Sequence, residues 1–256
     1  MKYIDVSYAQ GVIDWAQVKG SGKISGVIIR AGYGQNNIDD YFVRNISECN
    51  RLGIPCGVYW MSYALSPEMA RKEAEYCLAA IAPYRVELPV CFDFEDASVA
   101  WAQTQHVQIT KALASSFVEA FCSTIEHAGY YAVNYASWNF LENYFDTAIT
   151  RRWTLWLAWY TTKDHYVKSY QPGLWQYTDA ARVPGIRGHV DMSEVYYDYA
   201  AIIAERGLNR LPSEPQPWYA AAQAWAVAQG IADGTRPEEP ATRAEVWTML
   251  QRLSQK

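Results

Sequence analysis

The sequence predicts an α/β fold: an irregular (β/α) barrel with helices missing between its last strands, plus a small α-helical C-terminal module. From residue 1 to about 195, short β-rich runs alternate with helical stretches, which is the pattern of parallel βα units. Eight strand candidates occur, the number that closes such a barrel. We therefore expect a barrel over 1–208, a Pro-rich linker over 209–217 and a separate module over 218–256.

The eight expected strands are short runs of β-branched and aromatic residues bounded by Gly, Pro and polar residues. They cover residues 3–9, 26–31, 55–61, 88–95, 130–136, 154–160, 173–178 and 188–193.

Three helices are expected in the early gaps between strands. The first covers 40–53 and ends at Gly53, and the second begins with Ser66 as N-cap and Pro67 at its first position. A long amphipathic helix is expected over 104–129. The gaps 161–172 and 179–187 are typical of loops, so the last strands should lack regular helices between them.

The segment after the linker predicts a helix, a Gly-containing loop and a second helix. Thr242 is a candidate N-cap of the second helix, and Glu245 stands three residues later, which is the spacing of a capping box. A unit this small is not expected to be very stable alone, so it should pack on the barrel or on copies of itself.

The formal net charge of −5 and the absence of Lys/Arg runs argue against nucleic acid or an anionic membrane as the main partner. Neither a targeting segment nor an apolar stretch of about 20 residues is visible, so we expect synthesis in the cytosol. The five cysteines show no CxxC pair and are expected to be reduced core residues.

Carboxylates gather in "VCFDFEDAS" (90–98). Because side chains alternate along a strand, Asp93 and Glu95 should share one face while Phe92 and Phe94 pack against helices on the other. Two carboxylates at this spacing raise one another's pKa and can supply an acid and a base. Asp96 is expected to be an N-cap or to lie in the following loop.

Other strands end in polar or aromatic residues, and in a barrel of this kind such ends meet at one mouth where active sites lie. Among them are Asp5, Arg30, Tyr59, Tyr135, Gln176 and Asp191. No GxSxG, HExxH, GxGxxG or P-loop motif occurs, and the four histidines are scattered, so we expect neither a cofactor nor a metal ion.

Five segments, in order over residues 1 to about 200, resemble the lysozymes of glycoside hydrolase family 25: "IDVSYAQGVIDWAQVK", "GVIIRAGYG", "GVYWMSYA", "LPVCFDFED" and "GLWQYTDAARVPGIRGHVDMS". The family's Asp-x-Ser, Asp-x-Glu and Val-Asp motifs fall on Asp5 and Ser7, on Asp93 and Glu95, and on Val190 and Asp191.

The resemblance implies a peptidoglycan muramidase that cleaves the β-1,4 bond between N-acetylmuramic acid and N-acetylglucosamine. Glu95 would be the general acid. Asp93 would be either a base for water or, as the Asp-x-Glu spacing favours, the group that orients the sugar's 2-acetamido as internal nucleophile. Asp5 and Asp191 would hold these two in place. Candidates for lining the substrate cleft are Arg30, Tyr59, Tyr63, Tyr135, Trp156, Gln176 and Tyr177.

The tail "WAVAQGIADGTRPEEPATRAEVWTMLQRL" resembles one S-layer homology repeat, which implies binding to wall polysaccharide or association with copies of the chain into a homo-oligomer. Trp218, Arg243 and Glu245 would carry that role. The setting implied is a phage-type endolysin, or a prophage remnant, released to the wall through a separate holin-type membrane pore. An endo-hexosaminidase acting on another N-acetylated glycan and a non-catalytic glycan-binding barrel remain the alternatives.

Overall fold

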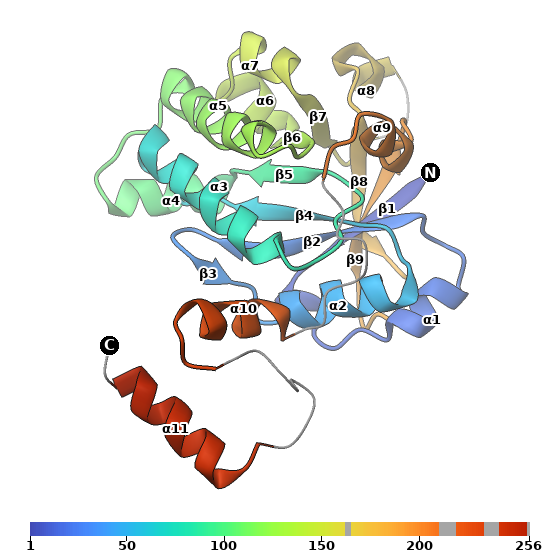
Figure 1. The fold of residues 1–256 in the computed structure, drawn as a ribbon. Helices are drawn as coiled ribbons and strands as arrows, with labels where there is room; N and C mark the ends of the chain where they lie inside the picture. Colours follow the sequence, from blue (N-terminus) through green and yellow to red (C-terminus); the bar gives the residue numbers. More distant parts are fainter. Residues whose placement is uncertain (162–164, 210–218, 233–240, 255–256) are drawn as a thin grey trace.

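Eight strands close into a barrel in the computed structural model, which describes residues 1–161, 165–209, 219–232 and 241–254 (Figure 1). The barrel strands are β1 (Lys2–Val6), β2 (Gly26–Tyr33), β4 (Cys56–Met61), β5 (Val90–Asp93), β6 (Ala132–Ser137), β7 (Thr154–Ala158), β8 (Leu174–Ala181) and β9 (Val190–Val195). A short strand, β3 (Asn37–Ile38), pairs with the end of β2. The expected fold class is confirmed.

The last strand, β9, runs in the opposite direction to its neighbours. It pairs antiparallel with both β1 and β8, whereas the other neighbouring barrel strands pair in parallel. The expectation of parallel units throughout is therefore wrong for β9. Residues 182–189, between β8 and β9, contain no helix, and so short a connection cannot carry the chain back to start a parallel strand.

Helices cover the outside of the barrel. They are α1 (Trp15–Gly20), α2 (Phe42–Leu52), α3 (Pro67–Ile81), α4 (Asp96–Thr104), α5 (Lys111–His127), α6 (Trp138–Asn143), α7 (Thr147–Arg152), α8 (His165–Tyr170) and α9 (Tyr199–Glu205), with a 3-10 turn η1 (Tyr8–Gln10). Among the described residues, only the short α8 lies between β7 and β8, and no helix lies between β8 and β9. Gly53 ends α2 in the left-handed conformation, and the Ser66 hydroxyl accepts from the Met69 N–H at the start of α3. Both helix-end predictions are confirmed.

The structure corrects three local predictions. The long helix expected over 104–129 begins only at Lys111, because His106 has a φ of +58° and the Thr110 hydroxyl caps α5 by accepting from the Leu113 N–H. The residue capping α4 is Glu95, and Asp96 is the first residue of that helix. The loop expected over 161–172 contains the short helix α8.

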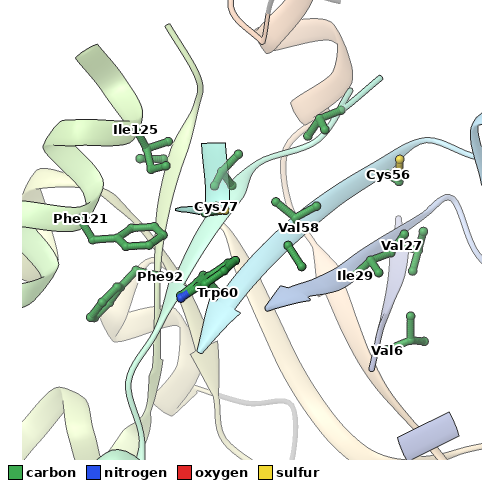
Figure 2. Close-up of a cluster of buried hydrophobic side chains, with 14 of the residues drawn as sticks. Val6, Val27, Ile29, Cys56, Val58, Trp60, Cys77, Phe92, Phe121 and Ile125 are labelled. Atoms are coloured by element: carbon green, nitrogen blue, oxygen red, sulfur yellow. The ribbon is translucent and has the colours of Figure 1, made fainter. Parts of the chain in front are cut away.

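Apolar side chains on the outer face of the strands form the main core beneath the helices. Figure 2 shows Val58, Trp60 and Phe92 from neighbouring strands pointing toward Cys77 of α3 and Phe121 of α5. A second cluster of buried residues fills the inside of the barrel, with Cys91 and Val133 among its members. All five cysteines are free and buried, as expected.

The C-terminal segment forms two helices, α10 (Ala220–Ala228) and α11 (Arg243–Ser254). The expected capping box is present: the Thr242 N–H donates to a Glu245 carboxylate oxygen at 2.7 Å, and the Glu245 N–H donates to Thr242 Oγ1 at 3.2 Å. Trp218 and the linker after Asn209 lie outside the described residues. None of the helices in the described ranges is both long and apolar enough for a membrane span.

Asn209, at the end of the barrel domain, forms hydrogen bonds with the segments that precede β5 and β6. Its Nδ2 donates to the carbonyls of Val86 and Leu88 at 3.0 and 2.9 Å, and its Oδ1 accepts from the Tyr131 N–H at 2.8 Å. The side chain is buried, and the backbone has a φ of +51°, which Asn tolerates better than most residues. One amide thus satisfies backbone groups that precede β5 and β6.

Replacing Asn209 with Ala should lower the free energy of unfolding by about 3 kcal/mol, because three hydrogen bonds are lost and the buried groups stay unpaired. Urea denaturation measures the change. The control is Asn143→Ala, since Asn143 is exposed and bonds only a neighbouring side chain. Equal midpoints for the two variants would contradict this role.

Candidate active site

Carboxylates from three strands meet at one end of the barrel. Asp93 is the last residue of β5, and Asp5 of β1 lies opposite Asp191 in the register of the β1–β9 pair. Because β9 is antiparallel, its first residues reach the end at which the parallel strands finish. They surround a cavity of about 220 Å³, lined by Asp5, Arg30, Tyr59, Met61, Asp93, Glu95, Tyr135, Trp156, Tyr160, Gln176 and Asp191.

All but two of the barrel candidates named from the sequence line this cavity. Tyr63 lies beside it, with its hydroxyl donating to Met61 Sδ at 3.8 Å. Tyr177 points to the other face of β8, where its ring packs against Trp175 and its hydroxyl accepts from Lys2. Sequence reasoning did not name Tyr160, although its spacing from Trp156 along one strand face could have identified it.

Gln176 connects Asp5 to the aromatic lining. Its Nε2 donates to both Asp5 carboxylate oxygens at 3.2 and 3.0 Å, and its Oε1 accepts from the hydroxyls of Tyr135 and Tyr160 at 3.2 and 3.3 Å. The two tyrosines fix the orientation of the amide, which therefore presents its NH₂ group to Asp5.

Among the described residues that line the cavity, Arg30 is the one cation, and it is paired with Asp39. Arg30 Nε and Nη2 lie 2.8 and 2.7 Å from Asp39 Oδ2. Asp39 is buried and also accepts from the backbone N–H groups of Tyr8 and Tyr41. The guanidinium is therefore fixed in place at the edge of the acidic cluster.

The environment of Asp93 and Glu95 favours their neutral forms. Burial, followed by the charges of Glu95 and Asp5, raises the pKa of Asp93 well above its ordinary value, and Arg30 opposes the shift. Burial and then Asp96 raise the pKa of Glu95, again against Arg30. One Asp93 oxygen, Oδ1, is buried without a hydrogen-bond partner among the described residues.

The pKa values of the other two carboxyls, Asp5 and Asp191, are also raised. Burial and then Asp191 raise the pKa of Asp5, although the bond from Gln176 lowers it. Burial and then Asp179 raise the pKa of Asp191. Because these carboxyls raise one another's pKa, the ionisation of one favours the neutral form of its neighbours.

This arrangement suits acid–base chemistry on an uncharged ligand. A protonated carboxyl can donate to a leaving oxygen while a neighbouring carboxylate stabilises positive charge or activates a nucleophile. Aromatic side chains supply flat walls with polar edges. Among the residues that the structure describes, no group of His, Cys, Asp and Glu is suited to hold a metal ion.

Solved structures of similar fold come from bacteria and a phage. The autolysin LytC of Streptococcus pneumoniae, solved with a synthetic peptidoglycan ligand, is 30% identical with a TM-score of 0.66, over 76% of this chain and 46% of that one. The chain thus spans about half the length of LytC.

Two other structures share the fold at lower identity. A lysozyme from Streptomyces coelicolor is 23% identical with a TM-score of 0.63, over 80% of this chain and 95% of that one. The catalytic domain of endolysin ply40, from a bacteriophage of Listeria monocytogenes, is 20% identical with a TM-score of 0.59, over 79% and 96%. The search of curated proteins found no significant relative.

The sequence pattern described as "Glycosyl hydrolases family 25" matches residues 4–186, which contain Asp5, Asp93 and Glu95 and end just before Asp191. That range is most of the chain and nearly all of the barrel. The protein therefore belongs to family 25 of the glycosyl hydrolases.

Proposed function

We propose that this chain is a peptidoglycan muramidase, which hydrolyses the β-1,4 bond between N-acetylmuramic acid and N-acetylglucosamine. The observation that carries the proposal is the pair formed by Asp93, at the end of β5, and Glu95, at the start of α4, both with raised pKa and both lining one cavity in a family 25 barrel. The LytC complex with a synthetic peptidoglycan ligand supports this choice of substrate.

Glu95 is the proton donor in this mechanism. It lies at the entrance to α4, is more exposed than Asp93, and has a pKa raised by burial, which favours the protonated form that a proton donor requires. Protonating the glycosidic oxygen lets the leaving sugar depart while positive charge develops at the anomeric carbon.

Asp93 assists the nucleophile that attacks the anomeric carbon. Its carboxyl lines the cavity, where it can meet a water molecule or the N–H of the sugar's 2-acetamido group. In the first case it is a general base; in the second it orients the acetamido oxygen for attack on the anomeric carbon, which we favour. Asp5 and Asp191 are positioning residues whose charges keep the pKa values of the cluster raised.

The tail is proposed to act as a wall-binding or self-associating module, and the whole protein to act at the bacterial wall after release through a holin-type pore. Large apolar side chains are exposed on α10 and α11: Trp225, Val227, Val246, Trp247, Leu250 and Leu253. A surface of this kind favours a partner over solvent. Arg243 is also exposed, whereas Glu245 is engaged in the capping box.

Replacing Glu95 with Gln should lower muramidase activity by about 10²–10⁴-fold, because Gln cannot donate a proton to the leaving oxygen. Purified peptidoglycan is digested with each protein, reduced with borohydride and analysed by mass spectrometry. The wild type should yield reduced muramic acid. Glu75→Gln, on the exposed face of α3, is the matched control.

Reduced glucosamine ends would instead indicate an endo-hexosaminidase. Equal yields from Glu95→Gln and the wild type would remove Glu95 from the mechanism. An absence of new ends from both proteins would favour a glycan-binding barrel.

Asp93→Asn should raise the free energy of unfolding at pH 7. Since the pKa of Asp93 is higher in the folded than in the unfolded protein, the folded state binds more protons, and stability falls as pH rises above about 4. Asn removes this loss, so the gain should shrink below pH 4. Thermal unfolding from pH 3 to 8 measures it, with exposed Asp40→Asn as control. A variant less stable at every pH would contradict the assignment.

Deleting residues 211–256 should reduce the mass of the particle in light scattering from a multiple of the chain mass to that of one shortened chain. The exposed apolar surface of α10 and α11 is the physical reason. Monomer mass for both proteins would end the association proposal and leave monovalent wall binding.

A further inference from the structure

Three aromatic rings form a row outside the cavity. Tyr33 ends β2, Tyr63 follows β4 and Trp101 lies on α4. The ring centroids of Tyr33 and Tyr63 are 6.2 Å apart, and those of Tyr63 and Trp101 are 6.4 Å apart, each pair edge to face. Tyr33 is 37% and Trp101 43% exposed, so the row presents a large apolar surface to solvent.

The row is continuous with the acidic cavity. The Tyr63 hydroxyl donates to the sulfur of Met61, which lines the cavity, and the Arg30 guanidinium lies 5.4 Å from the Tyr33 ring centre. Burial and then the charge of Glu95 raise the pKa of Tyr63, which places its hydroxyl within the field of the catalytic carboxyl. A linear polymer held in the cavity can therefore extend along these rings.

Glu73 forms a hydrogen bond with the backbone of Tyr63, whose ring is the middle one of the row. This α3 residue is fully buried, and its Oε1 accepts from the Tyr63 backbone N–H at 3.0 Å and from Gln35 Nε2 at 3.3 Å. Burial raises the pKa of Glu73 to about 7, although nearby donors, Ser62 first, oppose the shift.

An apolar residue would fill this position at less cost, because the other buried residues of α3 are Ala70, Ala74, Cys77 and Ile81. What the carboxyl adds is an acceptor for the backbone of the segment that carries Tyr63. The buried acid therefore fixes the position of an aromatic ring near the mouth.

We propose that Tyr33, Tyr63 and Trp101 form a saccharide subsite for a glycan unit next to the cleaved bond, and that Glu73 is the positioning residue of this subsite. The inference rests on the proposed function and adds to it a binding surface outside the catalytic cavity. A sugar ring is the occupant that fits, because its C–H face packs on aromatic rings while its hydroxyls stay in water.

The first test uses soluble glycan strands from which the stem peptides have been removed. Trp101→Ala and Tyr33→Ala should each raise KM on the order of tenfold and leave kcat unchanged, since an interaction equal in ground and transition state is lost. Tyr197→Ala is the matched control, because Tyr197 is 53% exposed and follows β9 at the opposite end of the barrel.

An unchanged KM for both variants, or a rise only when the stem peptides are present, would overturn the saccharide subsite. The second result would identify a peptide as the occupant.

The second test separates positioning from simple folding. Glu73→Leu removes the acceptor and keeps the volume, so KM should rise about as much as in Trp101→Ala. Glu73→Gln keeps the acceptor and should restore KM to near the wild-type value. In the double variant with Glu73→Leu and Trp101→Ala, the fold-increase in KM should be smaller than the product of the two single fold-increases, because both changes act on one subsite. Independent, multiplying effects, or no rescue by Gln, would overturn the role of Glu73.

A binding measurement keeps this inference separable from the catalytic proposal. Glu95→Gln is titrated calorimetrically with the same stripped glycan, alone and combined with Trp101→Ala. If the wild type fails to cleave but Trp101→Ala weakens binding about tenfold, the catalytic proposal fails and the subsite stands. If Glu95→Gln binds the glycan equally well with and without Trp101→Ala, the subsite proposal fails, whatever the wild type hydrolyses.

Discussion

The pairing of β1 with β2 on one side and β9 on the other is the interaction on which the rest of the site depends. It closes the barrel and places Asp5 opposite Asp191. Because β9 runs antiparallel, a residue at its start lies at the same end as Asp93 at the finish of β5. Without this reversal, Asp191 would lie at the other end of the barrel and the acidic cluster would lose a member.

The cluster illustrates a conflict between folding and chemistry. Burial is the first cause of the raised pKa of all four carboxyls, so each is less easily ionised in the folded chain than in the unfolded one. Burying the carboxyls lowers the free energy of unfolding, and the surrounding core of aromatic and branched side chains compensates for this loss. The hydrogen bonds between Gln176 and Asp5 recover part of this cost without neutralising the site.

Period-two alternation was enough to predict that Asp93 and Glu95 line one cavity, even though the strand ends before Glu95. The same rule shows why Gln176 and Tyr177 cannot both face inward: adjacent residues of β8 point to opposite faces. The direction of β9 was not predictable from a pattern of short strands. Glu73 carries no motif at all, and its role depends on a tertiary contact with Tyr63 that helical periodicity does not encode.

The fixed pairing of Arg30 with Asp39 also sets the electrostatic potential of the mouth. Since that pair is neutral as a unit, any ionised member of the acidic cluster leaves the cavity with net negative charge. Such a field lowers the local concentration of anions and leaves uncharged molecules unaffected, most strongly at low ionic strength. Under the proposed function, the opening would therefore favour neutral acetylated sugars over negatively charged polymers.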